Sequence, residues 1–94
     1  MRESLEKVIE RFILPQFPSI LSFNIEAYEE NVVILYVIGG EREKVLRTVY
    51  VVTFKFKDEK SRKKYHRKVE REVVSFFDMV GPEREDKIVV YSVV

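Results

Sequence analysis

The spacing of the hydrophobic residues changes repeatedly along this 94-residue chain, and these changes constrain its fold more than any other feature. In residues 3–14 and 59–79 the apolar residues recur every three or four positions, as on a helix with one buried face. In residues 20–29, 32–38, 45–57 and 88–94 they alternate with polar residues or run together, as in β-strands. The sequence therefore predicts the element order α-β-β-β-α-β.

The short connections determine how these elements are arranged. Glu30-Asn31 is predicted to be a turn because Asn tolerates positive φ, and Gly39-Gly40 is predicted to end the second strand. Three strands joined by short turns form an antiparallel meander, whereas the last strand returns after a helix and so runs parallel to the third through a right-handed crossover. We expect an α+β fold with a four-stranded mixed sheet and two helices, in one domain spanning residues 1–94.

The nearly continuous apolar run Val32–Ile38 bears on how the sheet is covered. Such a run is typical of a central strand that is buried on both faces. It favours helices on both faces of the sheet. Two alternatives stay open, namely that both helices share one face or that a dimer interface covers the other.

Composition excludes several classes of protein. The chain has no cysteine, which excludes a disulfide scaffold and a thiolate metal site. No apolar run is long enough to span a bilayer, and the N-terminus lacks the apolar core of a signal peptide, so a cytoplasmic location and no membrane partner are expected. Charged residues make up 35% of the chain, with one Gln and two Asn. This composition is typical of thermophile proteins, and an engineered origin is the alternative.

The charges are unevenly distributed, although the formal net charge is only +1. Residues 55–71 contain nine basic and three acidic residues. Helical spacing places five of the basic residues on the side of the second predicted helix that is opposite its apolar stripe. We call this set the basic ridge: Lys60, Lys63, Lys64, Arg67 and Arg71. The ridge predicts contacts with nucleic-acid phosphates, and a solvated face or intramolecular ion pairs are the alternatives.

Stability does not explain the position of the basic ridge. Much of it lies near the N-terminus of the predicted helix, where cations oppose the helix dipole and each other. A sequence selected for helix stability alone would carry these cations at the opposite end. This placement favours a functional interpretation of the ridge.

No set of residues predicts catalysis, a metal site, a cofactor or a small-molecule ligand. There is no Cys nucleophile, His66 is the only histidine, and no Gly-rich loop could hold a phosphate. The restriction-endonuclease-like nucleases share the predicted element order, but they need acidic residues beside a lysine to hold Mg²⁺. Here Lys55 and Lys57 each have a non-acidic residue two positions before them. We therefore predict a small non-enzymatic binding module, with a metal-dependent nuclease as the weakest alternative.

A few apolar residues predict self-association. The inward stripe of the second helix is predicted to contain Tyr65, Val69, Val73, Phe76 and Val80. Val74 and Phe77 then fall beside the basic ridge, and Val93 lies in a terminal strand with no charged residue to guard its edge. These three residues predict a homodimer, and a protein–protein or homo-oligomeric module is the competing function. A structural or surface role, rather than catalysis or metal binding, is expected for His66, which lies beside the inward stripe.

Overall fold

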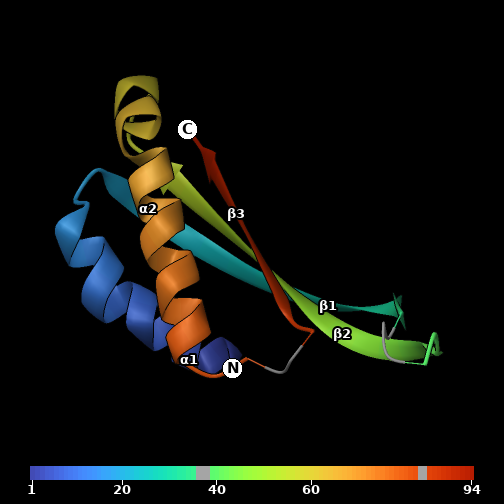
Figure 1. The fold of residues 1–94 in the computed structure, drawn as a ribbon. Coiled ribbons are helices and arrows are strands. Elements are labelled where there is room, and N and C mark those ends of the chain that lie inside the picture. Colours follow the sequence, from blue (N-terminus) through green and yellow to red (C-terminus); the bar gives the residue numbers. More distant parts are fainter. Residues whose placement is uncertain (36–38, 83–84) are drawn as a thin grey trace.

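The computed structural model describes residues 1–35, 39–82 and 85–94 of the chain. In chain order the elements are the helix α1 (Arg2–Val8), the π-helical turn η1 (Ile9–Ile13), the 3₁₀ turn η2 (Leu14–Gln16), the strands β1 (Ile20–Leu35) and β2 (Arg42–Phe56), the helix α2 (Glu59–Met79) and the strand β3 (Lys87–Val93). The sheet order is β1-β2-β3, with β1 antiparallel and β3 parallel to the central β2 (Figure 1). This confirms an α+β fold with a mixed sheet and a last strand that runs parallel to residues 45–57.

The prediction of four strands is wrong, because the described residues form three. Residues 20–29 and the first part of 32–38 belong to one strand, β1, while residues 36–38 lie outside the described ranges. Asn31 merely permits a turn, whereas the chain continues here as a strand, with Glu30 and Asn31 opposite Arg47 and Leu46 of β2. Glu30 lies opposite Arg47, and the Arg47 Nε donates a hydrogen bond of 2.5 Å to the Glu30 carboxylate.

The chain reverses at the two glycines, as predicted. Gly39 and Gly40 have φ angles of 92° and 64°, which are conformations that L-residues rarely adopt. The predicted strand break at Gly39-Gly40 is therefore confirmed, and β1 and β2 form one long hairpin.

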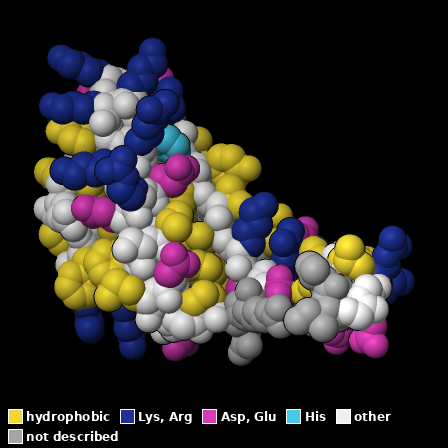
Figure 2. Space-filling model, in the orientation of Figure 1, with side chains coloured by type: hydrophobic (Ala, Val, Ile, Leu, Met, Phe, Trp, Pro, Cys, Tyr) yellow, Lys and Arg dark blue, Asp and Glu magenta, His cyan; other side chains and the backbone are white. Residues whose placement is uncertain are grey.

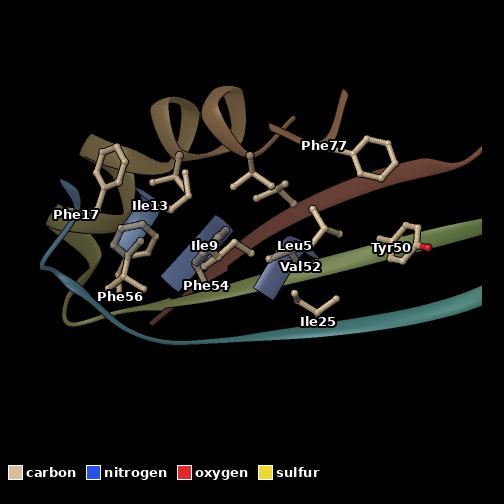
Figure 3. Close-up of a cluster of buried hydrophobic side chains, with 14 residues drawn as sticks. Leu5, Ile9, Ile13, Phe17, Ile25, Tyr50, Val52, Phe54, Phe56 and Phe77 are labelled. Carbon is tan, nitrogen blue, oxygen red and sulfur yellow. The ribbon is translucent and has the colours of Figure 1, made fainter. Parts of the chain in front are cut away.

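The hydrophobic core lies between one face of the sheet and the helices. Alternate residues of β2 face this core, and Val52, Phe54 and Phe56 are completely buried. They contact residues of the N-terminal helical segment and of α2 in one cluster (Figure 3), which also includes Leu5, Ile9, Ile13, Ile25, Val69, Val73, Phe77 and Val90. Both helices therefore cover the same face of the sheet.

The expectation of cover on both faces is not met by the described residues. Tyr28 and Tyr91 alternate with the core-facing residues of β1 and β3, and each is about half exposed. Val33 and Leu35, from the apolar run of residues 32–38, are each about 60% exposed. They are apolar but lie in a part of the hairpin that no described helix reaches.

This part of the hairpin, residues 29–35 and 42–48, is here called the hairpin arm. It extends beyond β3, whose pairing with β2 begins only at Val49, and it makes the molecule 50 Å long against 23 and 20 Å in the other directions (Figure 1). Among the residues described, the molecule contains no helix with both the length and the apolar character that crossing a membrane requires.

Candidate nucleic-acid interface

The helix that carries the basic ridge begins at a well-defined N-cap. Asp58 has extended backbone angles, and its carboxylate accepts a hydrogen bond of 2.7 Å from the backbone N–H of Ser61. This bond satisfies one of the four N–H groups that a helix leaves without a partner in its first turn. It also lowers the pKa of the Asp58 carboxyl, because the N–H bond stabilises the ionised form, with smaller contributions from Lys57 and Lys60.

Removal of this cap is our first prediction. Asp58→Ala is expected to lower the thermal midpoint at pH 7, because Ala cannot accept the Ser61 N–H. Since the folded pKa is lowered, the stabilisation is present above the unfolded pKa of about 4 and is lost as pH falls through the folded value. Thermal melts at pH 7 and near pH 3 measure this difference. Asp78→Ala, at an exposed site in the last turn of α2, is the control; an equal effect at both sites would contradict the capping role.

All five residues of the basic ridge are exposed on α2. They lie on the side of the helix opposite Val69 and Val73, which are buried against the sheet. Figure 2 shows Lys and Arg side chains gathered over the N-terminal half of α2, at the end of the molecule remote from the hairpin arm. The structure therefore brings the predicted ridge residues together on one open helical face.

The ion pairs of α2 leave the basic ridge available. Arg62 binds Glu59 and His66 Nε2 lies 3.6 Å from the Glu70 carboxylate, but within the described ranges no ridge residue forms an ion pair. The Glu6 carboxylate of α1 lies 3.8 Å from Arg2. The hydrogen bond to Arg62 also lowers the pKa of the Glu59 carboxyl. The positive charge of the ridge is thus exposed to solvent rather than neutralised by the acidic side chains of the described residues.

Tyr65, the aromatic residue that follows Lys64 of the ridge, takes part in the packing of α2. Tyr65 is half-buried and contacts Phe17 edge to face, with ring centroids 5.7 Å apart. The Lys64 ammonium lies 5.3 Å from the centre of the Tyr65 ring, which is a favourable cation–π distance. Because Phe17 and Lys64 both contact the Tyr65 ring, the ring is not free to stack on a nucleic-acid base.

His66 connects α2 to the edge of the sheet. Its Nδ1 lies 2.5 Å from the Ser92 hydroxyl of β3, so the two side chains share a hydrogen bond. Among the described residues no three His, Asp or Glu side chains are grouped closely enough to hold a metal ion. Lys55, considered above for a nuclease site, lies opposite Ser22 and Val93 in the sheet.

The predicted interface residues differ in exposure. Val74 and Val93 are 37% and 45% exposed, whereas Phe77 is only 3% exposed and packs on Tyr50 at a centroid distance of 5.8 Å. The prediction of Phe77 at the surface is wrong, and Phe76 instead lies half-buried at the rim, stacked on Phe12. The buried row Val69, Val73 and Phe77 follows a step of four, which is inclined to the helix axis, so the buried side rotates along α2.

A shallow pocket beside the ridge was not predicted from the sequence. Its volume is about 210 Å³, and it is lined by Pro18, Ser19, Lys57, Ser61 and Tyr65. Residues from the connector after η2 meet the start of α2 here, so only the tertiary structure brings them together. Lys57 adds one further exposed cation next to the ridge.

Three structural features of the basic ridge are consistent with an interface. The basic ridge is positioned by a capped helix, directed away from the core, and left without ion pairs by the described acidic residues. No protein-family model, no curated protein and no solved structure matches this chain.

Proposed function

We propose that this protein is a non-enzymatic binding module whose basic ridge contacts the phosphates of nucleic acids. The observation that carries the proposal is the exposure of five cations on one face of α2, none of them ion-paired within the described part of the chain. From Lys60 to Arg71 the helix rises by about 16 Å, at about 1.5 Å per residue. This is roughly the axial length of five nucleotides of one strand, at about 3.4 Å each.

The chemistry of the ridge supports contacts with the backbone rather than with bases. Lys presents a mobile point charge, and Arg67 and Arg71 present a guanidinium fork that fits two phosphate oxygens. Phosphate contacts of this kind orient a protein on nucleic acid but carry no sequence information. Because the Tyr65 ring is already engaged by Phe17 and Lys64, the proposed site also lacks a stacking contribution. We therefore expect binding with little sequence preference.

Salt dependence is the direct test of this proposal. If five phosphates are contacted, counterion release gives a slope of about −4.5 in a plot of log affinity against log salt for duplex DNA. Affinity should then fall by about 10²–10³ between about 50 and 200 mM salt. Fluorescence anisotropy with labelled duplexes of unrelated sequence measures both the slope and the sequence preference. Absence of binding at low salt, or affinity that is independent of salt, would refute the proposal.

A protein–protein or homo-oligomeric module is the second candidate function. It is supported by the exposure of Val74 and Val93 and by the position of β3 at an edge of the sheet, but not by the buried Phe77. Loss of self-association in sedimentation velocity when Val74 and Val93 are replaced by Lys, together with no binding of the unchanged chain in the anisotropy assay, would favour this candidate over the first.

A further inference from the structure

One side of the hairpin arm has a strand edge, residues Arg42–Arg47 of β2, that pairs with no strand among the described residues. On one side these residues pair with β1, but on the other side β3 begins its pairing only at Val49. The Thr48 N–H faces this second side, because it donates a hydrogen bond of 3.0 Å to the Asp86 carboxylate. Backbone groups alternate in direction along a strand, so those of Leu46, Lys44 and Arg42 face the same side. Within the described residues no strand pairs with them there, and such an edge is a template for another strand.

The sequence of this edge is complementary to itself in one antiparallel register. When two copies are aligned about Val45, Glu43 of each copy lies opposite Arg47 of the other, and the two Val45 residues lie opposite each other. Lys44 then lies opposite Leu46 of the second copy, and the backbone N–H and C=O groups of both residues point toward the other copy. The register therefore gives hydrogen-bonded pairs on both sides of a central non-hydrogen-bonded pair, as an antiparallel ladder requires. No like charges lie directly opposite each other.

The neighbouring strand β1 extends this complementarity. Within one chain Glu30 lies opposite Arg47, and Val32 lies opposite Val45. Pairing of two edges would place Arg47 between its own Glu30 and Glu43 of the second copy. Glu30 contacts Nε and Nη2 of Arg47, and the guanidinium has a further Nη with two N–H donors for a second carboxylate. The same pairing would align Val32 and Val45 of both copies in one apolar row across four strands.

The other two edges of the sheet are less suited to pairing with a second copy. The outer edge of β1 carries three carboxylates, Glu26, Glu29 and Glu30, and residues 20–35 contain no Lys or Arg. Antiparallel self-pairing about Tyr28 would bring Glu26 opposite Glu30, which is repulsive. The edge of β3 carries only Lys87 as a charged residue, so no charge pair selects a register there. Of the sheet edges formed by the described residues, the β2 edge is the one that combines backbone groups lacking a strand partner with a charge-complementary register.

We propose that the protein forms a homodimer through antiparallel pairing of residues Glu43–Arg47 of β2 with the same segment of a second copy. The two hairpin arms then form one four-stranded sheet in the order β1-β2-β2-β1, related by a two-fold axis that passes between the two Val45 residues. The inference does not depend on nucleic-acid binding, because it rests on the hairpin arm rather than on α2.

A single introduced cysteine tests the register. The chain has no cysteine of its own, so Val45→Cys creates a unique thiol. In a non-hydrogen-bonded antiparallel pair the two Cα atoms are about 4.5 Å apart, which a disulfide can bridge. Mild oxidation should convert most of the Val45→Cys protein to a covalent dimer on a non-reducing gel. Val93→Cys, on the competing β3 edge, is the matched control and should remain mostly monomeric; equal or faster cross-linking of this control would overturn the proposal.

Two charge reversals test the same register without a cross-link. Glu43→Lys and Arg47→Glu each place like charges opposite each other twice in a homodimer, so each should weaken dimerisation by about tenfold or more. In an equimolar mixture, each substituted position faces an opposite charge on the other variant, so affinity should return toward that of the unchanged chain. Sedimentation equilibrium measures the dimer fraction, and circular dichroism verifies that each variant is folded. A monomeric unchanged chain at the highest concentration, or a mixture no tighter than the single variants, would overturn the proposal.

Discussion

Replacement of the five residues of the basic ridge by Gln is expected to lower affinity for duplex DNA by at least about 10³ at about 50 mM salt. Each substitution removes one cation that releases a condensed counterion on binding, and Gln retains most of the length and the helix propensity of Lys and Arg. The salt slope should fall toward zero at the same time. Because all five side chains are exposed, the thermal midpoint should change little or rise, since cations near a helix N-terminus are unfavourable. Anisotropy titrations at several salt concentrations give both quantities.

A second variant with the same loss of charge separates the ridge from net charge. Five exposed basic residues outside the ridge can be replaced by Gln instead: Lys7, Arg11, Lys55, Lys57 and Lys87. If the ridge is the site, this control should retain most of the affinity, with Lys57 the residue most able to contribute because it lies beside the ridge. Equal loss in both variants would show that binding depends on overall charge and would contradict a defined interface on α2.

Phe54→Ala is expected to destabilise the fold by about 3–5 kcal/mol, the largest single-residue effect that we predict. Phe54 lies near the C-terminal end of the central strand β2, is completely buried and belongs to the core that both helices cover. Truncation removes the buried ring and leaves a cavity that the surrounding sheet and helices cannot fill. A loss of this size is a large part of the total stability of a small domain, about 5–15 kcal/mol. Urea unfolding followed by circular dichroism measures the change.

Phe12→Ala provides the comparison for this core variant. Phe12 is 52% exposed and stacks on Phe76 at the rim of the core. Its truncation should cost clearly less than that of Phe54, because part of its surface is already in contact with water. Similar losses of stability at the two sites would contradict the arrangement in which the helices pack on one face of the sheet over Phe54.

The ridge variants change the exposed side of α2, whereas Phe54→Ala changes the core on which the other side of α2 packs. Val69 and Val73 hold α2 on the sheet, while the basic ridge faces solvent on the other side. Core variants should therefore reduce stability and binding together, because they release the helix that positions the cations. Ridge variants should reduce binding alone. Loss of binding without loss of stability would show that the ridge binds nucleic acid and is not merely a charged face in contact with water.

Local patterns were sufficient to predict several features of the fold. The helix over residues 59–79 has the predicted bounds, because an apolar stripe with a helical period is preceded by the N-cap residue Asp58. The break at Gly39-Gly40 was predicted from the two glycines, which both have positive φ, although β2 begins at Arg42 rather than at Val45. The co-location of the ridge residues on one face also follows from helical spacing alone. In each case the deciding interactions join residues that are close in the sequence.

Other features depended on contacts between distant residues. Glu30-Asn31 was predicted as a turn, but pairing with Arg47 and Leu46 on β2 keeps these residues within one strand. Phe77 rather than Phe76 is buried, because the side of α2 that meets the sheet rotates along the helix and Tyr50 lies beneath its last turns.

By itself, the sequence determined the long helix, its cap and its charged face, since these depend on spacing within a few turns. The tertiary structure alone decided the number of strands, the side that the helices cover and the open edge of β2. The physical reason is that a strand has no partner within its own segment. Its length, its burial and its free edge are set by where other strands begin and end, and those limits arise from residues far away along the chain.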